Sequence, residues 1–302
     1  GIKGRTSIDV VLEENIEKLE EVVVVGYGIQ KKADVTGAIS TIKTEELTSI
    51  PVTNVATAMQ GRASGVQVVQ NSGSPGADVS IKIRGTGTIN NSDPLYVVDG
   101  FITEDINFLN PDDVQDIQIL KDASSSAIYG ARAANGVIIV TTKKGKEGKL
   151  KINFNTYWGT SDFWNQPDIM DKYQDSDLYE ASHGGQKLLA SARDTLLFND
   201  FAAENWMDHI SQKGMVSKYN LQVSGGTDRT KYIISGLYSS EDGIIKKSDQ
   251  VKTSFRLGIE TKLTDYIKLS INSIFTNSSR GIVTEGGDNI FQYALNTEPH
   301  LT

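Results

Sequence analysis

Few residues of this chain stand at spacings that support catalysis. The three histidines, His183, His209 and His300, are scattered, and no His-x-x-x-His pair able to hold a metal occurs. There is no cysteine, which excludes thiol nucleophiles and zinc-thiolate sites. The adjacent acids Glu45-Glu46 and Asp112-Asp113 are expected to be solvated or to lie at helix ends.

Motifs that bind phosphates or activate a serine are also missing. Gly85-Thr86-Gly87 lacks the third glycine and the following helix of a dinucleotide-binding fingerprint. Gly148-Lys149 is followed by Leu150, so it does not form a phosphate-binding loop. No Gly-x-Ser-x-Gly nucleophile elbow occurs. We therefore expect no enzymatic activity, no cofactor and no metal site.

The segment best suited to an interaction offers its backbone rather than its side chains. Val22-Val23-Val24-Val25 lies between Glu20-Glu21 and Gly26-Tyr27-Gly28. Four consecutive valines favour extended backbone. The segment is either an ordinary buried strand or an exposed edge that accepts a partner strand by β-augmentation. Local sequence leaves both alternatives open.

Composition limits the class of protein and its partners. The 302 residues carry a net charge of −8, with a pI near 5.0, which argues against a nucleic-acid partner. No window approaches the roughly 18 apolar residues of a spanning helix. A search for long apolar windows does not detect a transmembrane β-barrel, because only alternate residues of its strands face lipid. Without an initiator Met or an apolar leader at residue 1, we expect a processed or trimmed chain.

Residues 33 to 146 have the pattern of a compact α/β unit. Thr53-Asn54 is expected to cap a short helix that runs to Met59-Gln60 and stops at Gly61, and Asp122 to cap a helix over 123–129 that stops at Gly130. Asn110-Pro111-Asp112-Asp113 has the form of a helix start. Strands are expected at 66–69, 79–83, 95–98, 117–120 and 136–142, and Asp99-Gly100 is a turn signal.

After residue 148 five segments have strand patterns. Four of them alternate apolar and polar residues, and in the fifth, 231–239, both faces are apolar. The five segments cover 149–158, 216–224, 231–239, 251–260 and 267–276, and residues from 277 onward are expected to form a loop. Each is about ten residues long, the length of a tilted membrane-crossing strand. Short connections alternate with long ones, including 159–215, as in outer-membrane barrels. A soluble β-sandwich also alternates but does not easily accommodate so long an insertion. In that insertion 177–182 and 200–210 have helical patterns, and Trp206 is either a loop-core residue or a stacking platform.

The motifs taken in order resemble SusC-like TonB-dependent transporters. The Val22–Val25 run with Gly26-Tyr27-Gly28 is similar to that family's Ton box region. The remaining motifs are Gly61-Arg62-Ala63-Ser64-Gly65-Val66, Ile83-Arg84-Gly85, Pro94-Leu95-Tyr96-Val97-Val98-Asp99-Gly100, Leu120-Lys121-Asp122-Ala123-Ser124 and Tyr129-Gly130-Ala131-Arg132-Ala133-Ala134-Asn135-Gly136. Each is weak by itself, and the ordered series is specific.

The resemblance implies an α/β plug domain followed by the first antiparallel strands of an incomplete 22-stranded transmembrane β-barrel. It implies four regions: 1–19, the end of a carboxypeptidase-regulatory-like domain with a linker; 20–32, the Ton box region; 33–146, the plug; and 147–302, barrel strands and outer loops. Residues 1–14 would supply the last strand of the first region. TonB would bind Glu21, Val22, Val23, Val24 and Val25. The residues with a structural role in the plug motifs would be Gly61, Arg84, Gly85, Asp99, Gly100, Gly130, Arg132 and Gly136.

The implied activity is TonB-dependent import of a bulky nutrient, a glycan or peptide, across the outer membrane of a Gram-negative bacterium. The implied partners are TonB, a SusD-like surface lipoprotein, outer-membrane lipid and the substrate. Arg84, Asp99 and Arg132 are candidates for polar contacts inside the barrel, against the alternative that the glycines fix turns and the charges pair locally. Two other functions remain open: a soluble β-rich binding or adhesion module, and a TonB-linked signalling receptor.

Overall fold

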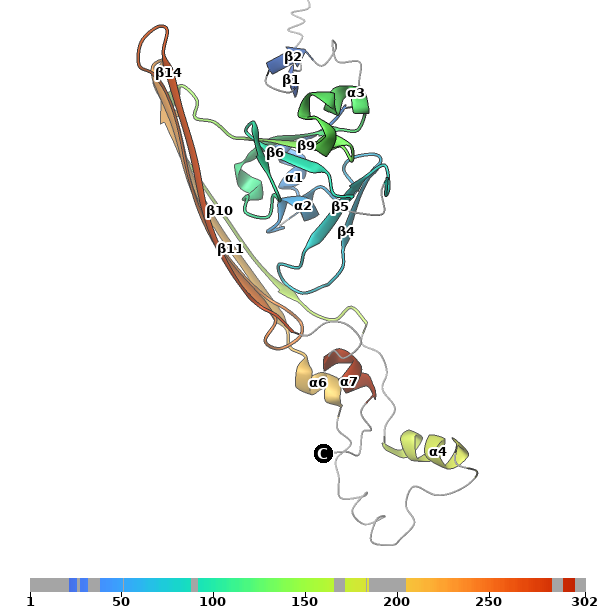
Figure 1. Ribbon diagram of the computed structural model, residues 1–302. Helices are drawn as coiled ribbons and strands as arrows, with labels where there is room; N and C mark the ends of the chain where they lie inside the picture. The colour runs from blue at the N-terminus through green and yellow to red at the C-terminus, as the bar shows by residue number, and fades with distance from the viewer. Residues whose placement is uncertain are drawn as a thin grey trace, which may run out of the picture.

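A computed structural model describes most of the chain. The described residues are 22–25, 28–31, 39–50, 52–87, 92–165, 172–182, 184, 205–283 and 290–296. The strand expected at 1–14, Glu21, His183 and His300 lie outside this part. Within it the chain forms an α/β unit that lies against one face of a curved sheet of long strands (Figure 1).

The α/β unit is built on a five-stranded mixed sheet in the order β3-β8-β9-β6-β7. Its strands are β3 (Ile39–Lys43), β6 (Leu95–Val98), β7 (Phe101–Thr103), β8 (Val114–Leu120) and β9 (Val137–Thr142). Only β6 and β9 pair in parallel. A separate hairpin of β4 (Val66–Gln70) and β5 (Val79–Ile83) completes the strands of this unit. Sequence patterns predicted β4, β5, β6, β8 and β9, and missed the short strands β3 and β7.

Both faces of the mixed sheet are covered, which explains why β6 and β9 are apolar on successive residues. The larger core cluster packs Ile42, Ile117, Ile119 and Ile138 against α1 (Thr44–Leu47), α2 (Val55–Ala58) and the β4–β5 hairpin. On the opposite face Leu95, Val97 and Ile139 pack with Ala133 from the segment after α3 (Ala123–Ser126).

Two of the predicted helices are confirmed in outline, with different ends. The side chain of Asn54 accepts a hydrogen bond from the Ala56 amide, as predicted for a cap, but α2 ends at Ala58. The helix predicted from Ala123 breaks into α3 and a 3-10 turn that ends before Gly130. Asp122 makes no capping bond there. Its carboxylate instead pairs with Arg84 at 2.6 Å.

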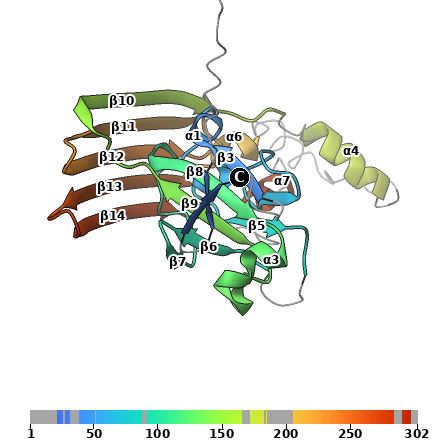
Figure 2. The ribbon, with the colours of Figure 1, turned by 90° about the horizontal axis from the view of Figure 1, so that it is seen from above.

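The second sheet is an antiparallel meander of five consecutive strands, as the alternating segments predicted (Figure 2). They are β10 (Gly148–Ser161), β11 (Gly214–Gly226), β12 (Thr230–Asp242), β13 (Asp249–Lys262) and β14 (Lys268–Gly281). At 13 or 14 residues they are longer than the predicted ten. The expected strand end at Thr276 was wrong, because β14 continues its ladder with β13 through polar residues to Gly281.

Helices occur in the long connections at one end of the meander. α4 (Lys172–Ser182) includes the predicted helical stretch 177–182, and α6 (Trp206–Ile210) is the described part of the stretch 200–210. α7 (Ile290–Asn296) lies beside α6 in a region expected to be loop (Figure 1). Trp206 is half-buried and its ring lies 5.7 Å from that of His209, which fits its interpretation as a loop-packing residue.

Candidate functional site

The α/β unit contacts the long-stranded sheet mainly through polar groups. Lys218 of β11 lies 2.6 Å from the carboxylate of Asp112, and both side chains are nearly buried. Beside this pair, Asp113 accepts hydrogen bonds from Ser235 of β12 at 2.8 Å and from Gln222 of β11 at 3.4 Å. Asp112 and Asp113 do lie at a helix end, in a single 3-10 turn capped by Asn110, but they are buried rather than solvated.

Burial changes the acidity of this turn. Loss of solvation raises the pKa of Asp113, while the hydrogen bond from Ser235, the charge of Arg256 and the bond from Gln222 act in the opposite direction. Burial also raises the pKa of Asp116 on β8. Desolvated carboxylates at a contact between two units make that contact sensitive to pH.

A second polar cluster joins the end of β9 to β13 and β14. Arg256 of β13 donates from Nη2 to the hydroxyl of Thr142 and, at 2.7 Å, to the carbonyl of Lys143. Asp99 accepts from the Thr142 amide at 2.9 Å and from the side chain of Asn272 on β14. Arg256 is buried, and its Nη1 has no hydrogen-bond partner within the described residues.

A third contact comes from a lysine that points out of the sheet into the α/β unit. Lys252 of β13 is buried and donates from Nζ to the carbonyls of Asn107 and Leu109, at 2.6 and 2.9 Å. Thr276 of β14 adds a bond of 2.8 Å to the carbonyl of Phe108. Three neighbouring carbonyls of one loop are thus bound by the sheet.

The polarity of the long-stranded sheet is reversed relative to a soluble protein. The face toward the α/β unit buries Asn220, Gln222, Ser235, Lys252 and Arg256. The opposite face exposes large apolar side chains on every strand, among them Phe154, Leu221, Ile234, Phe255 and Phe275. An exposed apolar surface of this extent is typical of a protein–protein or membrane interaction site. In β12, where the sequence left both faces apolar, Ile233 and Leu237 take the buried face.

Aromatic rings gather toward one end of the apolar face. Trp158 of β10 contacts Tyr219 of β11 edge-to-face at 6.0 Å and donates from Nε1 to its hydroxyl at 2.9 Å. Tyr219 lies directly opposite Tyr238 of β12 in the ladder, with ring centroids 6.3 Å apart. Amphipathic rings in a row are typical of the boundary between an apolar layer and water.

The valine run forms strand β1 (Val22–Val25), which pairs antiparallel with β2 (Gly28–Lys31). These two strands make a sheet of their own within the described residues. One edge of β1 therefore has no ladder partner in the described part of the chain. This favours the accessible-edge interpretation of the valine run over a buried central strand.

The predicted glycines occupy positions with left-handed backbone. Gly61, Gly85, Gly100, Gly130 and Gly136 all have φ between +72° and +91°. A Cβ at Gly136 would lie 2.7 Å from Cδ1 of Ile83 and 3.0 Å from the Leu120 carbonyl, whereas at Gly61 it would meet nothing within 4 Å. Gly136 therefore serves close packing as well as a turn.

The three predicted charged residues have different surroundings. Arg84 pairs locally with Asp122, and Arg132 is exposed in a 3-10 turn. Asp99 alone reaches the inner face of the long-stranded sheet, through Asn272. The predicted site residues did not include Lys218, Lys252 or Arg256, although charged residues on one face of an alternating strand are a signal that could have indicated them.

No group of three or more histidines, aspartates or glutamates within the described ranges is arranged to hold a metal ion. None of the helices described has the length and hydrophobicity to cross a membrane.

Comparison with known proteins decides the family. A family model of the TonB-dependent receptor plug domain matches residues 31–137. The chain is 36% identical, over 99% of its length, to TonB-dependent receptor P3 of Formosa agariphila, and 33% identical over 92% to TonB-dependent receptor SusC of Bacteroides thetaiotaomicron. The chain belongs to the SusC-like TonB-dependent receptors. The resemblance stated from the sequence motifs is confirmed.

Solved structures agree on the fold of this SusC-like chain. It matches the RagAB peptide importer in an open-open state with a TM-score of 0.77 and 30% identity, over 86% of the chain and 32% of that protein. The siderophore receptor PirA of Acinetobacter baumannii is 17% identical, with a TM-score of 0.53 over 80% of the chain, and supports the fold alone. The predicted fold class, a plug followed by antiparallel barrel strands, is confirmed.

The SusC-like chain is short compared with these relatives. It spans 30% of the length of receptor P3 and 28% of SusC. The plug and five strands described above therefore correspond to under a third of such a protein.

Proposed function

We propose that this chain is part of the barrel-plug subunit of an outer-membrane importer that takes up a bulky nutrient with energy from TonB. The reversed polarity of the five-stranded sheet carries the proposal. Its apolar face, with Phe154, Leu221 and Phe255 exposed, suits contact with outer-membrane lipid. Its polar face holds a plug where a channel would otherwise be open.

The cargo and the outer partner are proposed from the relatives. One solved relative is described as a peptide importer, and SusC is a TonB-dependent receptor of 33% identity. We assign to this protein a glycan or peptide cargo, captured with a SusD-like surface lipoprotein, and no catalytic step. The four predicted regions, 1–19, 20–32, 33–146 and 147–302, remain part of this proposal.

Strand β1 is proposed as the site where TonB binds. Its four valines favour extended backbone, and one of its edges has no partner among the described residues. A TonB strand added at that edge would form main-chain hydrogen bonds without needing a side-chain pocket. Glu21 precedes this strand, and the plug follows it, so a pull on β1 is transmitted to the plug.

Deletion of residues 20–26 in the full-length receptor tests this assignment. We expect substrate binding at the cell surface to persist and uptake to be lost. A matched control replaces all four valines by isoleucine, which preserves strand propensity and should preserve uptake, while replacement by glycine should abolish it. Uptake that survives the deletion would rule out β1 as the TonB-binding strand.

A further inference from the structure

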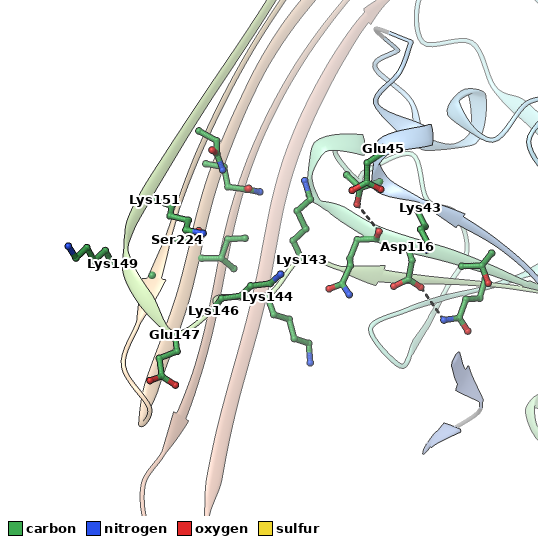
Figure 3. Close-up of a pocket in the computed structure, with 18 residues that line it drawn as sticks. Lys43, Glu45, Asp116, Lys143, Lys144, Lys146, Glu147, Lys149, Lys151 and Ser224 are labelled. Atoms are coloured by element: carbon green, nitrogen blue, oxygen red, sulfur yellow. Dashed lines mark hydrogen bonds between the residues drawn. The ribbon is translucent and has the colours of Figure 1, made fainter. Parts of the chain in front are cut away.

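A cavity separates the plug from the first strands of the barrel. It has a volume of about 530 Å³ and is lined by Asp116 and Gln118 of β8, by Asn153 of β10 and by Ser224 of β11. Residues 143–147, which connect the plug to β10, form a further wall (Figure 3). Every residue that lines the cavity is described, and those on the long-stranded sheet belong to β10, β11 and β12.

The walls of this cavity carry an excess of positive charge. Six lysines line it against three acids, Glu45, Asp116 and Glu147. Lys144 also pairs with Glu260 at 3.0 Å. The whole chain, by contrast, has a net charge of −8. The lysines are Lys43, Lys143, Lys144, Lys146, Lys149 and Lys151.

Most of these lysines belong to the inner side of the sheet and to the connector. Lys143, Lys144 and Lys146 extend from the connector between the sheet and the plug, and Lys151 lies beside Ser224, whereas Lys149 points away (Figure 3). The cavity is therefore on the side of the sheet opposite its exposed apolar face. A soluble acidic peptide fits this position better than a lipid headgroup does.

The chain itself contains such a peptide. Residues 13–21 hold five glutamates and one lysine, a net charge of −4, and end immediately before β1. β1 lies at the end of the plug where the chain leaves it to begin β10, which is also the end of the sheet that carries the β13–β14 turn (Figure 1). The acidic segment and the basic cavity are thus attached to the same end of the molecule.

We propose that the acidic segment 13–21 docks into the basic cavity between the plug and β10–β11. Each ion pair formed at an open cavity is weak, so the docking is reversible and sensitive to salt. Docking tethers β1 on its N-terminal side as well as through the plug. If β1 is the TonB-binding strand, as proposed above, TonB binding competes with this tether. That consequence depends on the proposed function, but the docking does not.

Cross-linking in a cysteine-free full-length receptor tests the docking. Ile16→Cys keeps every charge of the segment, and Ser224→Cys places its partner on the cavity wall. The matched control is Val223→Cys, one residue away on the opposite face of β11. We expect oxidation at low salt to cross-link position 16 to 224 at least several-fold more than to 223. The 16–224 yield should fall several-fold in 1 M NaCl, where the screening length is about 3 Å.

Charge removal gives a second measurement that does not depend on disulfide geometry. The pair Lys143→Gln and Lys146→Gln should raise the rate at which a protease cuts within 13–21 several-fold, whereas Lys149→Gln should leave it unchanged. Equal cross-linking at 223 and 224 would overturn the proposal. So would a cross-linking yield that does not change with salt together with a cleavage rate that does not change when Lys143 and Lys146 are replaced. A cavity that serves lipid phosphate would give that negative result. None of these readouts uses transport, so a failed uptake assay and a failed docking assay are distinguishable.

Discussion

The ammonium nitrogen of Lys218 lies 2.6 Å from a carboxylate oxygen of Asp112, across the boundary between barrel and plug, with side chains 12% and 11% exposed. Breaking such a pair by removing one partner leaves a buried charge, which costs about 3–5 kcal/mol. We expect Asp112→Asn and Lys218→Met each to lower the free energy of plug unfolding by that amount. Urea titration of the full-length receptor measures it.

The double variant Asp112→Asn with Lys218→Met is the control for this pair. Because it leaves no unpaired charge, its cost should be well below the sum of the single costs. Additive costs would show that the two residues act independently, and that the plug is held by its other contacts.

The stability of the plug should depend on pH through Asp113. Burial raises its pKa above the ordinary value of 3.8. The folded state therefore holds the proton at pH values where the unfolded state has lost it. As the pH falls from the folded-state pKa of Asp113 to 3.8, proton binding stabilises the folded state. This stabilisation is lost as the pH rises through the same range. Asp113→Asn removes this contribution.

We therefore expect wild type to gain stability relative to Asp113→Asn as the pH is lowered from 7 toward 4, by about 1.4 kcal/mol for each unit of pKa shift. Paired urea titrations across this range measure the difference, so that carboxylates common to both proteins cancel. A difference that stays flat would mean that Asp113 titrates normally.

Alanine substitutions at two glycines of the plug motifs distinguish the cost of backbone conformation from the cost of overpacking. Both Gly61 and Gly136 have left-handed backbone, which costs an alanine about 1–2 kcal/mol. Only Gly136 has neighbours where the Cβ would lie, Ile83 and Leu120. Overpacking adds about 1–3 kcal/mol. Thermal unfolding should therefore rank Gly136→Ala as the more damaging change, and equal effects would contradict the close packing.

Features set by neighbouring residues in the sequence could be predicted, whereas contacts between residues distant in the sequence could not. Alternation is a local property, so the five barrel strands could be predicted, and so could the two polarities of the faces of every one except β12. Caps are local too, and Asn54 behaved as expected. Asp122 did not, because Arg84, distant in sequence, binds its carboxylate.

The plug-barrel contacts could not be predicted from the sequence for the same reason. Arg256 meets Thr142 across 114 residues, and Asn110 meets Asn220 across 110. Which inward-facing residue reaches which plug loop depends on strand register and on how the plug is oriented. Asp112 and Asp113 were expected to be solvated or at a helix end, and burial by the sheet decided between these alternatives.

The apolar face of the barrel strands gives the most direct test of their environment. Leu257 of β13 lies in one ladder row with Ile234, between the rows of Tyr238 and Tyr232 and nearer that of Tyr232, whereas Thr253 shares the row of Tyr238. If lipid covers this face, Leu257→Arg places a charge near the centre of the hydrocarbon, at a cost of about 2–4 kcal/mol, and Thr253→Arg near the interface costs about 0–1 kcal/mol. Folding of the full-length receptor into vesicles, followed by urea titration, measures both. If the two variants were equally stable, the face would be in water, and the sheet would belong to a soluble protein.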